Sequence, residues 1–216
     1  MTEIIKKTIK SLEQNGMECS YAERKEDVLP IAKDLVPKGA VVGVGGSVTL
    51  NETGVMALLR NGDYAFLDRE APGLSPKEIE DVMKRCLLAD WFLTSSNAVT
   101  EKGEIYNVDG RGNRLAALNF GPDNVLIIIG KNKIVKDLKE AELRVKSVAA
   151  PKNAVRLSCA TPCAKLGKCI SLSSNEPHLT EGCACEQRIC RNYLVLGKQK
   201  NDGRIKVIIC GEALGY

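Results

Sequence analysis

Six of the nine cysteines in this 216-residue chain lie within one stretch, residues 159–190. Cysteines that fill a hydrophobic core follow helix or strand spacing, whereas these are separated by short intervals rich in glycine, proline and small polar residues. Short intervals allow several thiolates to converge on one ion or cluster. The C-terminal quarter is therefore expected to hold a metal site, drawn from Cys159, Cys163, Cys169, Cys183, Cys185 and Cys190.

Two other interpretations of the grouped cysteines stay open: unliganded or redox-active thiols, and a disulfide framework. Disulfides belong to oxidising compartments and to small domains with too little core. Residues 1–10 alternate charged and apolar side chains without an apolar stretch of signal-peptide length, and no later segment is long and apolar enough to span a bilayer. We expect a cytosolic protein without a membrane partner, in which reducing conditions favour metal ligands over disulfides.

The cysteine spacing does not identify the metal. Thiolates suit zinc and iron–sulfur clusters alike, and the intervals match neither the CxxC pairs of common zinc modules nor the CxxCxxC run of bacterial ferredoxins. His178, the single histidine, is either a further ligand or an exposed loop residue. A hydrolytic dyad that needs histidine is therefore excluded from the rest of the chain, and acid–base chemistry there falls to Glu, Asp, Lys or Tyr.

A second region suited to chemistry is a glycine-rich turn after the strand expected over residues 40–44. Glycines let backbone N–H groups approach a ligand closely, hydroxyls add donors, and a helix N-terminus favours an anion. The spacing is neither that of a Walker loop nor that of a dinucleotide fingerprint. A tight turn capped by serine is the structural alternative. The expected ligand is a phosphate or carboxylate, bound by Gly43, Gly45, Gly46, Ser47 and Thr49.

Carboxylates near this turn are candidate general bases. Glu52 follows the turn on the next helix, where it either faces the pocket or caps the first turn. Asn97 and Thr100 come just after another expected strand, at the sheet edge where ligands usually bind. Asp109, Asn113 and Arg114 would add a carboxylate, an amide and a cation to the same crevice, although Asp-Gly and Gly-Asn are also ordinary hairpin sequences. Glu52 is the preferred base and Asp109 the second.

The pattern of elements predicts an α/β fold. Apolar periodicity indicates helices over 2–15, 25–36, 50–60, 75–88 and 136–149, and strands over 40–44, 90–94, 125–129 and 204–209. Strands that alternate with helices imply a sheet covered on both faces. The length supports one main domain, 1–216, with the cysteine segment 159–190 inserted before the last strand. The net charge of +4 is spread along the chain, which argues against a nucleic-acid partner.

Several motifs in the same order resemble the LUD (lactate-utilisation) domain family, in particular its stand-alone bacterial and archaeal members with a C-terminal cysteine segment. The resemblance covers nearly the whole chain. The motifs are residues 45–54, 89–100, 109–114, 161–169, 188–192 and 211–216.

This resemblance implies a three-layer α/β sandwich similar to the group of ribose-5-phosphate isomerase, glucosamine-6-phosphate deaminase and CoA-transferase, with the ligand pocket at residues 43–49. LUD proteins in lactate operons accompany iron–sulfur subunits, which favours an iron–sulfur cluster over zinc. The family pattern implies Cys163, Cys169, Cys185 and Cys190 as the core ligands. A longer loop before Cys185, with Cys183 in it, and the upstream Cys159 depart from that pattern.

Three functions remain in competition. The first is a protein of organic-acid metabolism that binds a small anionic metabolite and a metal or cluster. The second is an electron-transfer or assembly partner, without catalysis of its own, for iron–sulfur redox subunits. The third is a sugar-phosphate or CoA-ester isomerase or transferase. Whether the chain is an enzyme, and whether it forms a homo-oligomer, stays open.

Overall fold

A six-stranded parallel sheet forms the centre of the computed structural model, which describes residues 1–174 and 178–216. Its strand order is β1-β10-β7-β4-β2-β3, so that elements from both ends of the chain pair in one sheet. The strands are β1 (Glu18–Ala22), β2 (Val41–Val44), β3 (Ala65–Leu67), β4 (Trp91–Thr94), β7 (Asn124–Gly130) and β10 (Ile205–Cys210).

The central strands are buried on both faces because their side chains are apolar without alternation. In β7, Leu126 and Ile128 point into one core, whereas Ile127 and Ile129 point into the other, and all four are fully buried. This is the pattern expected of a parallel sheet that is covered by helices on both sides.

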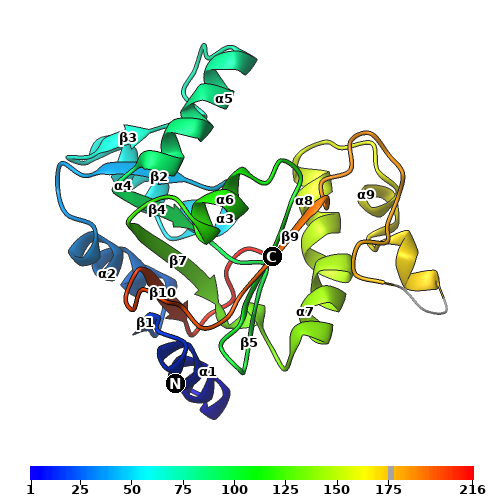
Figure 1. Cartoon of the computed structure of the whole chain (residues 1–216), viewed down its shortest axis with the longest axis horizontal. Helices are drawn as coiled ribbons and strands as arrows, with labels where there is room; N and C mark the ends of the chain where they lie inside the picture. The colour runs from blue at the N-terminus through cyan, green and yellow to red at the C-terminus, as the bar shows by residue number, and fades with distance from the viewer. Residues whose placement is uncertain (175–177) are drawn as a thin grey trace.

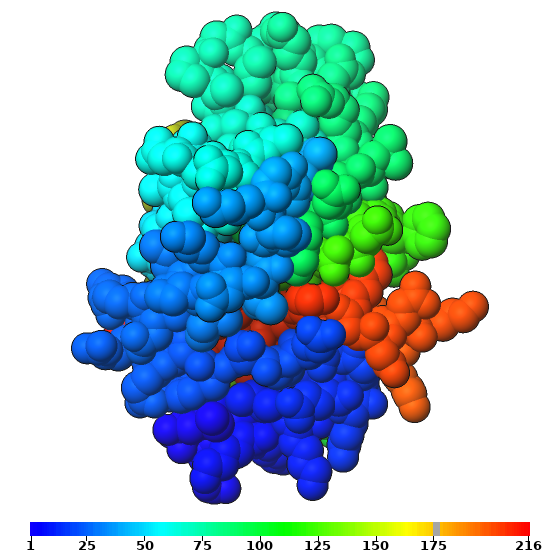
Figure 2. Space-filling model, turned by 90° about the vertical axis from the view of Figure 1, so that its left-hand side faces the viewer, coloured from blue at the N-terminus to red at the C-terminus, as the bar shows by residue number. Residues whose placement is uncertain are grey.

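Helices cover both faces of the sheet and produce the expected three-layer α/β sandwich (Figure 1). One face packs against α2 (Val28–Leu35), α3 (Val48–Glu52) and α4 (Val55–Asn61). The other packs against α1 (Glu3–Gln14), α6 (Asn113–Asn119) and the short helix Cys86–Leu88 that follows α5 (Pro76–Arg85). Figure 2 shows α1 and α2, in blue, over the lower half of one side of the molecule. The similarity to the isomerase and transferase group stays a prediction.

A second sheet of order β8-β5-β6-β9 packs on the first. Val99 and Ile105 on one of its faces join the core of the large sheet, whereas Tyr106 on its other face packs under α7. The sequence indicated only turns across most of this region, because strands of two to five residues leave no clear periodicity. These strands are β5 (Ala98–Thr100), β6 (Ile105–Asp109), β8 (Ile134–Val135) and β9 (Asn192–Leu196).

The helix expected over 136–149 extends further than predicted. It consists of α7 (Leu138–Arg144), a π-helical turn (Val145–Ala149) and α8 (Ala150–Arg156). Pro151 lacks the N–H that a regular α-helix needs at an interior position, and the turn just before it is π-helical rather than α-helical. The proline therefore does not end the helix, which continues to Arg156.

Other boundaries also differ from expectation. The helix predicted over 50–60 is divided at Gly54, whose φ of 74° lies in the left-handed region. The cysteine segment contains α9 (Pro162–Leu166) and a short 3₁₀ helix (Ile170–Ser173), and β9 and β10 follow it. Across the described residues, every helix is too short or too polar to span a membrane.

Candidate functional site

Three strands of the large sheet end at one cavity. β2 leads into the glycine turn, β4 into Ser95 and its neighbours, and β7 into the short helix Lys131–Lys133. Because parallel strands have their carboxyl ends at the same edge, the residues that follow them meet there. The cavity has a volume of about 430 Å³, and Gly46, Thr49, Ser95 and Lys133 are among the residues that border it. This volume suits a small metabolite.

Ser47 acts mainly as a helix cap. Its Oγ accepts a hydrogen bond from the backbone N–H of Leu50 at 3.3 Å, which is the structural alternative considered for this residue. The helix that it caps, α3, has only five residues, so its N-terminus offers little positive potential. The attraction for an anion must therefore come from side chains.

The three glycines of the turn have different surroundings. A side chain at Gly43 would meet Cys86 at 2.7 Å, and one at Gly45 would meet Thr94 Oγ1 at 2.6 Å. These two glycines therefore allow the turn to pack against its neighbours. A side chain at Gly46 would instead collide with the guanidinium of Arg69, and Gly46 borders the cavity. Of the three, Gly46 is the glycine placed to contact a ligand.

The cavity is bordered by cations that lack a carboxylate partner. In the described part of the chain, Arg69, Lys133 and Arg156 have no carboxylate within ion-pair distance. The neighbouring Glu70 is paired with Arg60 at 3.2 Å. Burial is the main cause of a lowered pKa at Arg69, and the nearby Arg156 adds to it. These cations make the cavity attractive to a negatively charged ligand.

Lys133 is the most unusual residue of the cavity. Its side chain is buried, and its Nζ donates hydrogen bonds to Ser95 Oγ at 2.8 Å and Thr49 Oγ1 at 3.1 Å. Burial, with smaller contributions from Arg144 and Arg114, lowers the pKa of Lys133 from 10.5 to about 7. Sequence reasoning did not select this lysine. The available signal was its position in the short segment that follows an apolar strand, where parallel sheets place their ligands.

Arg114 organises one wall of the cavity. It donates to Asp109 Oδ1 at 2.6 Å, to Asn97 Oδ1 at 2.9 Å and to the carbonyl oxygen of Ser95 at 3.1 Å. Asn113 also borders the cavity. The structure thus brings Asn97, Asp109, Asn113 and Arg114 together at one wall, and Asp109 and Arg114 are already paired there.

Asp109 and Gly110 do not form a hairpin turn, which was the alternative interpretation of the sequence. It ends β6, and after Gly112, with φ of 84°, the chain enters α6. Gly112 permits this sharp strand-to-helix turn, because glycine adopts the left-handed conformation without steric cost. The turn places the side chains of α6 against the cavity.

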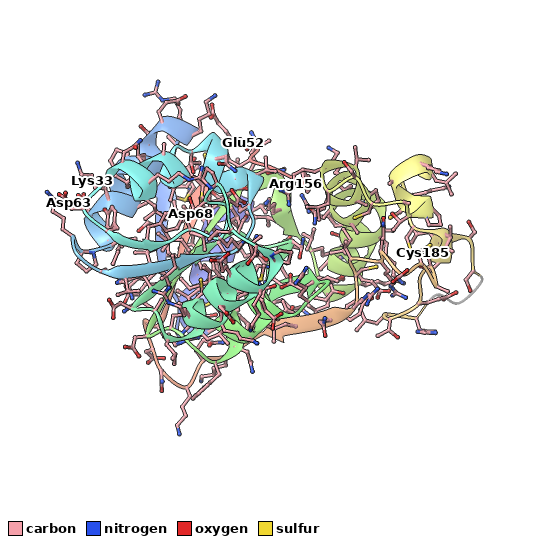
Figure 3. The ribbon with its side chains drawn as sticks, turned by 90° about the horizontal axis from the view of Figure 1, so that it is seen from above. Lys33, Glu52, Asp63, Asp68, Arg156 and Cys185 are labelled. Atoms are coloured by element: carbon pink, nitrogen blue, oxygen red, sulfur yellow. The ribbon has the colours of Figure 1, made fainter. Side chains whose placement is uncertain are left out.

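Thr100 and Glu52 have other surroundings. Thr100 Oγ1 donates to Glu104 Oε2 at 2.8 Å within the β5–β6 turn. Glu52 Oε2 accepts a hydrogen bond from the backbone N–H of Gly215 at 2.6 Å and thereby holds the segment that ends at Tyr216. Neither side chain is among those that border the cavity in the described structure. Figure 3 shows Glu52 and Arg156 near the junction of the sheet and the 138–156 helix, far from Cys185.

The cysteine segment packs around a second, much smaller cavity of about 20 Å³. This cavity lies beside the π-helical turn, where the carbonyl oxygen of Lys146 accepts a hydrogen bond from the backbone N–H of Cys169 at 2.8 Å. Cys185 borders a separate surface hollow, and a hydrogen bond with Cys183 is the main cause of its raised pKa. Four cysteines border the small cavity: Cys163, Cys169, Cys183 and Cys190.

The thiols are near one another without forming a metal centre. All nine cysteines belong to the described residues and are free thiols. Among residues 1–174 and 178–216, no three His, Cys, Asp or Glu side chains are arranged to hold a metal ion. Cys159 does not border the small cavity, and its Sγ lies 3.8 Å from the carbonyl oxygen of Leu157, whereas the ring of His178 lies 3.4 Å from Thr180 Oγ1. Coordination by cysteines stays a prediction.

Tyr106 adds an unsatisfied polar atom beside these thiols. Its side chain borders the small cavity and is 2 % exposed. Within the described residues its buried hydroxyl has no hydrogen-bond partner, and burial is the main cause of its raised pKa. Such a group normally has a partner, because leaving it unpaired costs about 1–3 kcal/mol.

The fold and the cavity define an α/β protein with a cation-lined pocket at the carboxyl edge of a parallel sheet. The chain belongs to the LUD domain family, whose model matches residues 5–210, and this family is associated with lactate utilisation. The resemblance inferred from the sequence motifs is thereby confirmed.

One solved structure supports the fold. A DUF162 family protein from Deinococcus radiodurans is 20% identical, with a TM-score of 0.50 and 97% of each chain covered. Two proteins from Chaetomium thermophilum are less similar. For eIF2B beta the identity is 16%, the TM-score is 0.36, and the match covers 54% of this chain and 44% of that chain. For eIF2B delta the identity is 13%, the TM-score is 0.33, and the match covers 64% of this chain and 53% of that chain. No curated protein matches the sequence of this chain.

Proposed function

We propose that this protein binds a small anionic metabolite in the 430 Å³ cavity and acts in cytoplasmic organic-acid metabolism of the lactate type. The observation that carries the proposal is that Arg69 and Arg156 border one cavity, each without a carboxylate partner among the described residues. An anionic ligand would supply the missing counter-charge. Membership of the LUD family supports an organic acid as the ligand.

The cations of the cavity would have separate roles in such binding. A guanidinium can donate two parallel hydrogen bonds to a carboxylate or phosphate, which suits Arg69 and Arg156 to hold the anionic group. Arg114 is committed to Asp109 and two carbonyl oxygens, so that it shapes the wall instead. Because Gly46 has no side chain, the guanidinium of Arg69 fits beside it.

Replacing Gly46 with valine should abolish ligand-dependent stabilisation. The new side chain would displace the guanidinium of Arg69 and fill part of the cavity, whereas the flexible end of Arg69 can move without unfolding the chain. The measurement is the thermal shift with lactate, pyruvate, sugar phosphates and CoA esters, since a ligand that binds the native state raises its apparent stability.

Gly197→Val is the matched control, because a side chain there would meet no atom within 4 Å and the residue lies between β9 and β10. The control should keep both its melting temperature and its ligand response. An unchanged ligand response in Gly46→Val would reject this site.

We further propose that the cysteine segment binds an iron–sulfur cluster or zinc. Four cysteines border one cavity, and the unpaired hydroxyl of Tyr106 beside it could donate a hydrogen bond to a cluster sulfide or thiolate. The thiols would have to move closer together on binding, because metal binding and folding of such a loop are coupled. A cluster would supply electron transfer, whereas zinc would stabilise the loop.

Metal content should depend on Cys163, Cys169 and Cys190, and the fourth ligand can be identified by serine substitution. The family pattern favours Cys185, but Cys183 borders the cavity with the other three. We expect Cys183→Ser to lose most iron, sulfide or zinc in anaerobically prepared protein, and Cys159→Ser, whose side chain does not border the cavity, to retain it. Loss of metal in Cys185→Ser but not in Cys183→Ser would identify Cys185 as the fourth ligand, as in the family pattern. A wild-type protein without any metal would exclude coordination by the cysteines.

The ligand-dependent thermal shift and the metal content together distinguish the other candidate functions. An electron-transfer or assembly partner for iron–sulfur redox subunits would carry a cluster yet show no metabolite response. A sugar-phosphate or CoA-ester enzyme would respond to those ligands rather than to lactate or pyruvate.

A further inference from the structure

We propose that Lys133 is a catalytic nucleophile, which forms an imine with the carbonyl carbon of a small aldehyde or ketone that carries a carboxylate or phosphate. This inference rests on the proposed function, since the anionic group must be held in the cavity. It goes further because it assigns a reacting atom, the Nζ of Lys133, and a class of substrate.

The surroundings of Lys133 favour a reactive amine over a structural one. Its side chain is only 3 % exposed and borders the 430 Å³ cavity. Lys146 is similarly buried, at 6 %, but its Nζ lies 2.9 Å from the Glu142 carboxylate. Lys133 has hydroxyl partners instead, and hydroxyls do not hold an ammonium in its charged form as a carboxylate does.

Hydrogen bonding also orients the nitrogen. A neutral amine has two N–H bonds and one lone pair. Donation to Ser95 Oγ and Thr49 Oγ1 uses both N–H bonds, so that the lone pair occupies the remaining direction. With a pKa of about 7, half of the Lys133 side chains are neutral near pH 7, roughly a thousandfold more than for an ordinary lysine.

Arg69, which would bind the anionic group, and Lys133 both lie beside the glycine-rich turn. Gly46 and Thr49 are three residues apart in the glycine-rich turn. The Arg69 side chain lies beside Gly46, and the Lys133 side chain lies beside Thr49. A carboxylate or phosphate on the arginine would therefore place an adjacent carbonyl group toward the lysine. Small oxo acids and phosphorylated carbonyl compounds share this arrangement.

The reaction balances without an oxidant or reductant. The lone pair of Nζ attacks the carbonyl carbon, and the carbonyl oxygen gains the proton that the nitrogen loses, which gives a carbinolamine. The C–O bond then breaks, water leaves with a second proton from nitrogen, and a C=N bond forms. The products are one imine and one water.

Trapping with borohydride tests the inference on the full chain. Pyruvate, glyoxylate and dihydroxyacetone phosphate are the probes, and lactate, which has a carboxylate but no carbonyl, is the control ligand. We expect one reduced adduct per chain with a carbonyl probe, located by peptide mass spectrometry at Lys133, and none with lactate. Lys133→Arg and Lys133→Met should lose the adduct, whereas Lys131→Arg, at an exposed neighbour, should keep it.

The outcomes separate this inference from the proposed function. A carbonyl probe that stabilises the protein thermally but is never trapped at Lys133 would overturn the imine while leaving anion binding intact. Adducts spread over exposed lysines, and equal in Lys133→Met, would overturn it as well. The absence of stabilisation by every probe and by lactate would reject the proposed function, and the imine with it.

Discussion

Replacing Lys133 with methionine should stabilise the protein near neutral pH and destabilise it at high pH. Burial, Arg144 and Arg114 lower the folded-state pKa of Lys133 to about 7, and Glu52 opposes this shift only in part. Below pH 7 both states carry the proton, and the folded state bears the full cost of a buried charge. Between pH 7 and 10.5 only the unfolded state is protonated, so that the free energy of unfolding rises with pH.

The size of the effect follows from the shift. One pKa unit corresponds to about 1.4 kcal/mol, so the change from 10.5 to about 7 corresponds to about 5 kcal/mol. Methionine removes this cost but also leaves two hydroxyls without their donor, at about 1 kcal/mol each. We expect Lys133→Met to be roughly 3 kcal/mol more stable than wild type near pH 6 and roughly 2 kcal/mol less stable near pH 10.5.

Urea unfolding across this pH range at constant ionic strength measures the difference. Lys131→Met is the control, because this exposed lysine lies in the same short helix, and its substitution should have a small effect of the same size at each pH. If the difference between Lys133→Met and wild type does not change with pH, Lys133 is charged in the folded protein throughout, and its role as a neutral amine fails.

The long apolar elements could be predicted from the sequence, whereas the short ones could not. β7 and β10 consist mainly of β-branched and aliphatic residues, and the Ser75-Pro76 start of α5 carries a capping box that the structure contains. β8 has two residues and β3 three, too few for any periodicity to distinguish a strand from a turn. These strands form because neighbouring strands and a shared core select their conformation.

The residues of the candidate site also divide into those that could be predicted from the sequence and those that could not. Gly46, Asn97, Asp109 and Arg114 lie in or beside a recognisable strand or glycine-rich motif, and the structure places them at the cavity. Arg69 and Lys133 belong to no motif, and their importance arises from contacts made across the fold. Burial, together with the lack of a carboxylate partner among the residues that the structure describes, makes Lys133 unusual, and neither property can be read from its sequence neighbours.

Replacing Arg114 with methionine should cost about 3–5 kcal/mol of stability. The side chains of Arg114 and Asp109 are only 12% and 11% exposed, and their ion pair measures 2.6 Å. Arg114 also donates to the carbonyl oxygens of Ser95 and Val108 and to Asn97 Oδ1. Its loss would leave a nearly buried carboxylate and three acceptors without these donors, and the wall of the cavity would lose its order.

Chemical unfolding of Arg114→Met and of the exposed neighbour Arg111→Met provides the comparison, and the Arg111 variant should lie within about 0.5 kcal/mol of wild type. The double variant Asp109→Asn/Arg114→Met decides the cause. If the penalty comes mainly from the uncompensated carboxylate, removing its charge should recover part of the stability, so that the two substitutions are clearly non-additive. Additive losses would instead mean that Arg114 acts through its bonds to the backbone, as a brace between β4 and β6 that holds Ser95 beside Lys133.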